Sequence, residues 1–170
     1  MNSIPPNFVI DRPLSWVHFR LTIDGWHPLV AMQQPSRDTR WNELKDLGIR
    51  HVLRLSEESQ PYDPSPLQML GMVIMEDQYE EEKPTDAVQE ELRLIEAVSL
   101  LHDGLRHGGV AVHCVGGRGR TGTVIGAFLR TLGVPHATIL QKINLAYQDA
   151  GRDGWPESPW QGEVVGRIRL

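Results

Sequence analysis

The chain is poor in cysteine, in long apolar runs and in positive charge. Its 170 residues hold a single cysteine, Cys114, so an internal disulfide is excluded. No apolar run approaches the roughly 18 residues of a membrane span. Residues 1–11 lack the basic start and apolar stretch of an export signal, so we expect a cytoplasmic protein. A net charge of −5 argues against a nucleic-acid partner.

The remaining composition, 40% hydrophobic without repeats or low-complexity segments, suits one domain over residues 1–170. We expect residues 1–15 to form an irregular N-terminal arm. Short apolar or alternating segments predict strands at 17–23, 29–32, 49–55, 71–75 and 109–114. Helical patterns lie between and after them, at 41–47, 85–105 and 158–168. Two further helices are expected, one that ends at Gly133 and one that begins at Pro135. This alternation predicts a three-layer α/β/α sandwich with a mostly parallel central sheet of about four to five strands.

The most informative segment is residues 113–122, which read His-Cys-Val-Gly-Gly-Arg-Gly-Arg-Thr-Gly. It joins a predicted buried strand to a predicted helix, so its last residues lie at a helix N-terminus, where unpaired N–H groups and the helix dipole attract anions. The glycines let several backbone amides converge on one point, and Arg120 adds a planar fork for two phosphate oxygens. This positive environment stabilises the Cys114 thiolate, a strong nucleophile.

This segment resembles the signature of cysteine-dependent protein tyrosine phosphatases, in which five residues separate His113-Cys114 from Arg120-Thr121-Gly122. Its glycine pattern resembles the compact dual-specificity type. The resemblance implies that Cys114 forms a phosphocysteine intermediate and that Arg120 clamps the transition state. It further implies that Thr121 hydrogen-bonds the sulfur and that His113 braces the loop. The phosphate-binding residues it implies are Val115, Gly116, Gly117, Arg118, Gly119 and Arg120.

Two other interpretations of the chemistry are weaker. Residues 117–122 formally match the dinucleotide-binding pattern Gly-x-Gly-x-x-Gly, but no acidic residue ends a second strand about 20 positions on. The spacing of His102, His107 and His113 does not stack metal ligands on one helical face, so we expect neither a metal nor another cofactor.

The general acid that protonates the leaving oxygen has two candidates. In the resembled family the acid follows the strand before the long helix, which favours Asp77. Asp86 is the alternative, although Thr85 is expected to cap the next helix with Asp86 in its first turn. Near the C-terminus, Gln161 resembles a family glutamine that orients the water of the second step.

The chain length leaves little room for the added loop that deepens the pocket of strictly tyrosine-specific relatives. We therefore expect hydrolysis of phosphotyrosine, and also of phosphoserine and phosphothreonine, in a phosphorylated protein or peptide, with phosphate-like anions bound in the same site. Arg118 leaves a phosphoinositide or inositol-phosphate substrate as an alternative. A catalytically silent module that binds phosphorylated residues is a second alternative.

Overall fold

The computed structural model describes residues 4–57 and 60–169, which form six strands and five helices. The strands are β1 (Phe8–Asp11), β2 (Phe19–Ile23), β3 (Leu29–Met32), β4 (Ile49–Arg54), β5 (Gln68–Met72) and β6 (Gly109–His113). The helices are α1 (Trp41–Asp46), α2 (Ala87–Gly104), α3 (Gly119–Thr131), α4 (His136–Asp149) and α5 (Pro159–Arg167).

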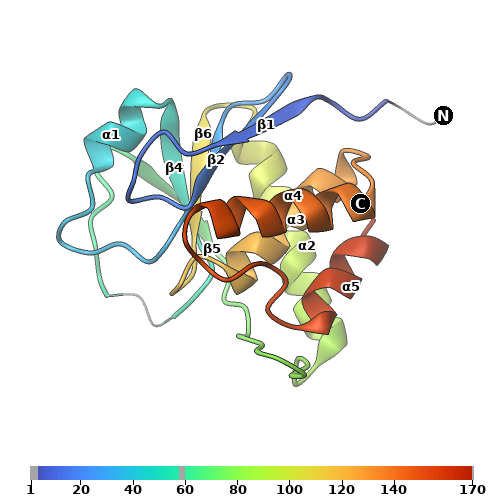
Figure 1. Ribbon diagram of the computed structural model, residues 1–170. Helices are drawn as coiled ribbons and strands as arrows, with labels where there is room; N and C mark the ends of the chain where they lie inside the picture. The colour runs from blue at the N-terminus through green and yellow to red at the C-terminus, as the bar shows by residue number, and fades with distance from the viewer. Residues whose placement is uncertain (1–3, 58–59, 170) are drawn as a thin grey trace.

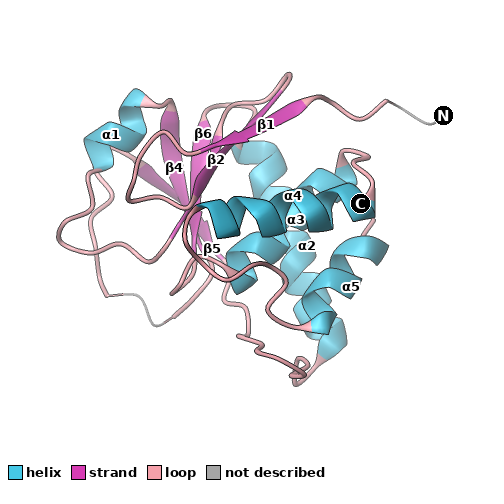
Figure 2. Cartoon of the chain, viewed as in Figure 1, coloured by secondary structure: helices cyan, strands magenta, loops and turns pink. Residues whose placement is uncertain are grey.

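All six strands belong to one sheet in the order β1-β2-β3-β6-β4-β5 (Figure 2). β3, β6, β4 and β5 are parallel, whereas β1 and β2 pair antiparallel at one edge. β2 and β3 are joined by a hairpin turn, where Gly25 has a φ of 85° that favours glycine. β6 therefore lies inside the parallel part, and its C-terminal end is flanked by neighbouring strands.

The sheet has one strand more than the four to five predicted. Residues 8–11, expected to belong to an irregular arm, form the edge strand β1 instead, while residues 1–3 of that arm lie outside the described residues. Only four residues long and half-exposed, β1 lacks the apolar alternation that marks a strand in the sequence. The bounds of β5 also differ from the prediction: the strand was predicted over 71–75, and it spans Gln68–Met72.

The helices divide unequally between the two faces of the sheet, giving the predicted three layers (Figure 1). The larger core lies under α2–α5 and includes Phe19, Leu101, Phe128 and Tyr147. The smaller core lies on the α1 side and includes Val30, Leu44 and Val52. Burying apolar side chains on both faces fixes the central strands and thereby the loop that follows β6.

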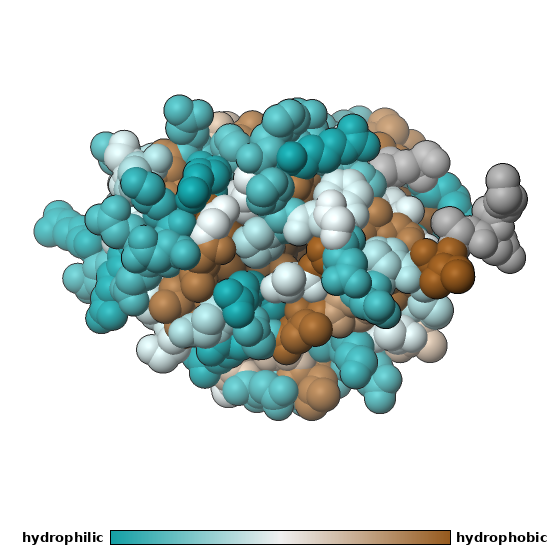
Figure 3. Space-filling view, turned by 90° about the horizontal axis from the view of Figure 1, so that it is seen from above, coloured by the Kyte–Doolittle hydropathy of each residue, from teal (hydrophilic) through white to brown (hydrophobic). Residues whose placement is uncertain are grey.

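The surface differs in character from these two cores. Figure 3 shows a face that is mostly hydrophilic, with apolar side chains in small groups. Among the described residues, no helix is long and apolar enough to cross a membrane.

Candidate active site

The signature loop, residues 114–121, runs from the carboxyl end of β6 through the first residues of α3. β6 is buried at every position, and α3 is buried from Gly119 to Leu129. The loop is therefore held between two rigid elements, at the end of parallel strands where α/β folds commonly bind ligands. The sequence correctly placed it between a strand and a helix.

The Cys114 sulfur is buried and receives two hydrogen bonds from the same loop. The Gly117 N–H lies 3.2 Å from Sγ, and the Thr121 hydroxyl donates across 3.3 Å. Only 2% of Cys114 is exposed. Donors directed at the sulfur favour its anionic form, as a nucleophile requires.

The carbonyl groups of the loop all point to partners in the scaffold. Each carbonyl from Cys114 to Gly119 accepts a hydrogen bond, from His113 Nδ1, Gln34 N, Arg152 Nη1, Tyr147 Oη, Gly122 N and Thr123 Oγ1 in turn. The Gly116 oxygen also lies 2.8 Å from His18 Nε2. With the carbonyls bound outside, the peptide units present N–H groups to the inside, which is the arrangement an anion cradle needs.

Gly117 shows why one loop position has to be glycine. Its φ is 73°, and a Cβ there would lie 2.2 Å from the Met32 carbonyl oxygen. A side chain would therefore push the loop away from β3 and move the Gly117 N–H that reaches the sulfur.

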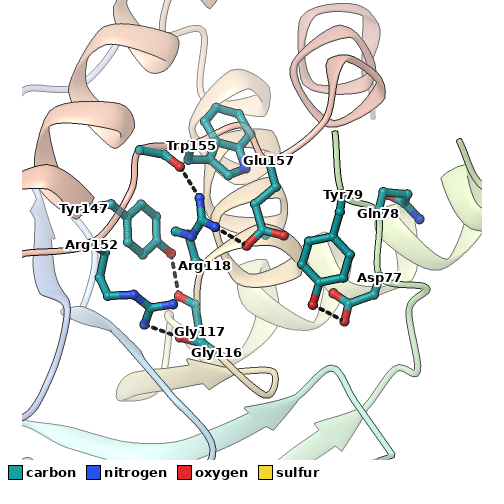
Figure 4. A network of polar contacts seen from close by, with 12 residues as sticks. Asp77, Gln78, Tyr79, Gly116, Gly117, Arg118, Tyr147, Arg152, Trp155 and Glu157 are labelled. Atoms are coloured by element: carbon teal, nitrogen blue, oxygen red, sulfur yellow. Dashed lines mark hydrogen bonds and ion pairs between the residues drawn. The ribbon is translucent and has the colours of Figure 1, made fainter. Parts of the chain in front are cut away.

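Arg120 and Asp77 meet beside the buried sulfur. The Arg120 guanidinium is 3.1 Å from Asp77 Oδ2 and donates to the Met75 carbonyl across 3.3 Å. Arg120 is only 4% exposed, whereas 34% of the Asp77 side chain is exposed. Tyr79 donates its hydroxyl to the same Asp77 oxygen across 2.9 Å (Figure 4). Asp77 is thus paired with the predicted clamp and is the more exposed member of the pair.

The segment that carries Asp77 is anchored at both ends. On one side, the buried Glu90 of α2 accepts the Glu76 N–H at 2.7 Å, and Glu76 accepts the Thr85 N–H at 2.9 Å. On the other side, the Glu80 N–H donates to the Glu157 carbonyl across 2.9 Å. These contacts hold the acid candidate near the loop although the segment has no regular secondary structure.

Asp86, the alternative acid, has a structural task instead. It is the N-cap of α2, and its carboxylate accepts the Gln89 N–H at 3.1 Å. The prediction that Thr85 caps this helix is wrong by one residue, because Asp86 adopts the extended capping conformation.

His113 lies behind the loop and is fully buried. Because the Cys114 carbonyl can only accept, Nδ1 carries the proton of that 2.9 Å contact, and Nε2 accepts the Tyr62 hydroxyl at 2.7 Å. Burial lowers the pKa of His113 to about 4 and raises the pKa of Tyr62 to about 12. His113 is therefore a neutral link between Tyr62 and the loop.

Arg118, the loop's other arginine, is turned toward the C-terminal segment (Figure 4). Its guanidinium lies 3.1 Å from Glu157 Oε1 and donates to the Gly154 carbonyl across 2.5 Å. Only 16% of its side chain is exposed. The side-chain charge of Arg118 is therefore already paired with Glu157, and phosphate binding by this residue stays a prediction.

Gln161 is buried next to the loop, 1% exposed. Its Oε1 accepts the Glu157 N–H at 2.8 Å, and its Nε2 donates to the Gln78 carbonyl across 3.5 Å. A Cβ on Gly119 would lie 3.0 Å from that Nε2. The side chain thus connects the C-terminal segment to the acid-bearing segment, and its role in orienting water stays a prediction.

Sequence reasoning missed four residues that support the loop: His18, Tyr147, Arg152 and Glu157. His18 lies just before β2, Tyr147 lies near the end of α4, and Arg152 and Glu157 lie in the segment between α4 and α5. Burial lowers the pKa of His18 to about 4, so it is a neutral donor to the Gly116 carbonyl beside Arg152. No local pattern marks these residues, because each contacts the loop only through the tertiary fold.

A groove of about 1090 Å³ opens at Val115 and Gly116. Its other walls come from the segment after β3 up to the start of α1, from the segment between β4 and β5 and from the segment after α4. They include Arg37, Trp41, Tyr62, Asp63 and Arg152. Among the residues described, no group of three or more His, Cys, Asp or Glu side chains is arranged to hold a metal ion.

Comparison with solved structures supports the fold. DUSP15 is 18% identical with a TM-score of 0.60, over 94% of this chain and 88% of that chain. The core catalytic domain of the PP-IP phosphatase SIW14 from S. cerevisiae, in complex with citrate, is 15% identical with a TM-score of 0.58, over 82% and 79%. P. aeruginosa TpbA, in complex with pTyr, is 17% identical with a TM-score of 0.58, over 82% and 79%.

A comparison with curated proteins finds no significant match. The family model described as the Swiss Army Knife protein, DSP-PTPase phosphatase domain (PTP-SAK), matches residues 26–152. This segment is well over half of the chain and contains Asp77 and the whole signature loop, while Glu157 and Gln161 lie beyond its end. The chain belongs to this family of dual-specificity-type protein tyrosine phosphatase domains and is a cysteine-dependent phosphatase.

Proposed function

We propose that the protein hydrolyses phosphate monoesters on phosphorylated proteins, phosphotyrosine as well as phosphoserine and phosphothreonine, through a phosphocysteine intermediate. One observation carries the proposal. The Cys114 sulfur receives hydrogen bonds from Gly117 and Thr121, in a loop whose carbonyls are all bound outside, beside the Arg120–Asp77 ion pair. These contacts support Cys114 as the nucleophile, the loop as the anion cradle and Asp77 as the acid.

In the first step, the Cys114 thiolate attacks the phosphorus and the bond to the ester oxygen breaks. The loop N–H groups and the Arg120 guanidinium bind the three non-bridging oxygens, whose charge they stabilise in the transition state. Asp77 gives its proton to the departing oxygen, so that an alcohol or phenol leaves rather than an alkoxide or phenoxide.

In the second step, water attacks the phosphorus and the sulfur–phosphorus bond breaks. Asp77, now a carboxylate, takes a proton from the water, and phosphate is released. The Thr121 hydroxyl, 3.3 Å from the sulfur, stabilises the departing thiolate. Gln161 is proposed to help place the water, and Gln161→Ala should then slow breakdown of the intermediate more than its formation.

Two features favour a protein substrate over an inositol phosphate. The Arg118 charge is paired with Glu157, so the loop side chain that could bind a second phosphate is occupied. The groove at Val115 and Gly116 offers room for the residues on either side of a phosphorylated side chain.

The experiment is hydrolysis of p-nitrophenyl phosphate by wild type and Cys114→Ser without added metal, followed by kcat/KM for phosphopeptides, phosphoinositides and inositol phosphates. We expect turnover by wild type alone and the highest kcat/KM for phosphopeptides. A wild type that binds phosphopeptide without turnover would establish a reader module instead. A higher kcat/KM for inositol phosphates would overturn the protein substrate.

A further inference from the structure

The carboxylate of Glu157 is buried beside the signature loop, and only one of its two oxygens has a polar partner among the described residues. Oε1 pairs with Arg118 at 3.1 Å, and 8% of the side chain is exposed. Oε2 is buried without a hydrogen-bond partner among the described residues, and a Cβ on Gly119 would lie 2.6 Å from it. A negative charge is therefore held against the loop that has to bind an anion, and the mechanism above gives it no task.

The position of Glu157 is fixed by its backbone as well as by its side chain. Its N–H donates to Gln161 Oε1 across 2.8 Å, and its carbonyl accepts the Glu80 N–H at 2.9 Å. The paired Arg118 is fixed in turn by the Gly154 carbonyl. In Figure 4 the Glu157 carboxylate lies between the Arg118 guanidinium and the Tyr79 side chain. The ion pair is thus part of the built site, unlike a chance contact between mobile surface side chains.

The space next to this pair is acidic. A cavity of about 600 Å³ is lined by Arg118 together with Glu80, Asp153 and Glu157. A second phosphate placed here would meet three carboxylates and one arginine that is already paired. Like charges at short range in a partly buried site disfavour such binding.

We infer that Glu157 is a specificity-determining residue, which neutralises Arg118 and thereby excludes substrates carrying further phosphate groups next to the reacting one. The inference deepens the proposed function and rests on it in one respect. The substrates that Glu157 would exclude, phosphoinositides and inositol phosphates, are the alternative to the protein substrate proposed above. It explains why a loop with two arginines would still favour a single phosphate ester, such as one phosphorylated side chain of a protein.

The test is the inhibition constant of inositol hexakisphosphate against p-nitrophenyl phosphate hydrolysis, in wild type and Glu157→Gln. Glutamine keeps the shape and the hydrogen bond from Arg118 but removes the charge. We expect inhibition about tenfold tighter in the variant, the effect of one partly buried charge. Glu163→Gln is the matched control, because it removes the same charge from an exposed position on α5 and should leave the constant unchanged.

Two further variants separate charge from packing. Glu157→Asp keeps the charge in a shorter side chain, so it should exclude the polyanion as wild type does. Arg118→Met combined with Glu157→Gln removes both charges, and the tighter inhibition should disappear, because the gain requires a freed Arg118. A gain that persists without Arg118, or that Glu157→Asp shares, would overturn the inference in favour of a packing effect.

Failure of this inference and failure of the proposed function give different results. Unchanged inhibition in a folded, active Glu157→Gln overturns the role of Glu157 whichever substrate wild type prefers. A wild type that hydrolyses inositol phosphates faster than phosphopeptides overturns the protein substrate, and the comparison of variants still decides whether Glu157 restrains polyanions. Thermal melting of each variant identifies any loss that is due to unfolding.

Discussion

Two arginines stand two positions apart in the signature segment, and their surroundings differ. Arg120 lies beside the nucleophile, paired with an Asp77 side chain that is 34% exposed. Arg118 is turned outward and paired with a Glu157 side chain that is 8% exposed. The local sequence does not distinguish the two side chains. In the function we propose, the acid that each arginine meets, and how deeply that acid is buried, determines which arginine can bind an incoming phosphate.

The largest expected effect comes from replacing each arginine by lysine. Lysine keeps the charge but loses the planar fork, so Arg120→Lys should lower kcat by about 10³-fold or more. Arg118→Lys can still pair with Glu157 and should change kcat by less than about threefold. Steady-state kinetics with p-nitrophenyl phosphate measure both, and similar losses would abolish the distinction between the two arginines.

The next effect concerns the two aspartates. Asp77→Asn should lower kcat by about 10²-fold or more and remove the basic limb of the pH–rate profile, because the acid is lost. Asp86→Asn is the matched control, since asparagine caps a helix as well as aspartate, and it should keep both turnover and stability. A loss confined to Asp86→Asn would reverse the assignment.

A smaller effect is expected on the outer side of the loop. Tyr147→Phe removes the 2.7 Å hydrogen bond to the Gly117 carbonyl and should destabilise the fold by about 1 to 3 kcal/mol. Since Gly117 also donates to the sulfur, kcat should fall by a few-fold, with KM less affected. Thermal melting and kinetics on the same samples decide whether the hydroxyl positions the loop or only packs.

The last expected effect is a pH dependence of stability, with the smallest consequence for catalysis. The folded-state pKa values of His18 and His113, about 4, lie below the usual value of 6.5. As pH falls from 6.5 toward 4, the unfolded chain binds protons that the folded protein does not, so stability falls by at most about 1.4 kcal/mol per pH unit for each histidine.

Melting curves of wild type and His113→Asn between pH 7 and pH 4.5 measure this effect. The variant should be less stable at pH 7, because the link between Tyr62 and the loop is changed. Its melting temperature should also fall less steeply with pH. Parallel curves for the two proteins would contradict the neutral state of His113.

The sequence predicted best what depends on neighbours in the chain. The strand, loop and helix around Cys114 follow from residue type and spacing. The resemblance to the phosphatase signature implied the contact of Thr121 with the sulfur and the place of His113 behind the loop. Asp77 was predicted to be the acid from the order of strand and helix. It pairs with Arg120, and its role as the acid stays a prediction.

What the sequence could not predict depends on contacts between distant segments. Tyr147 and Arg152 hold carbonyls of residues about 30 positions away, and Glu157 pairs with Arg118 at a similar separation. Such partners leave no periodic or spacing signal. Gln161 was expected to act on water, and the structure shows its amide bound to the Glu157 N–H and the Gln78 carbonyl. β1 was missed for a different reason, because four half-exposed residues carry too weak a pattern.

The central claim is that Cys114 carries the phosphoryl group during turnover. Rapid acid quenching of wild type with p-nitrophenyl phosphate, followed by peptide mass spectrometry, tests it most directly. The account predicts phosphate on Cys114 of wild type and none on Cys114→Ser. Phosphate on another residue, or a burst of p-nitrophenol without any phosphorylated protein, would contradict it.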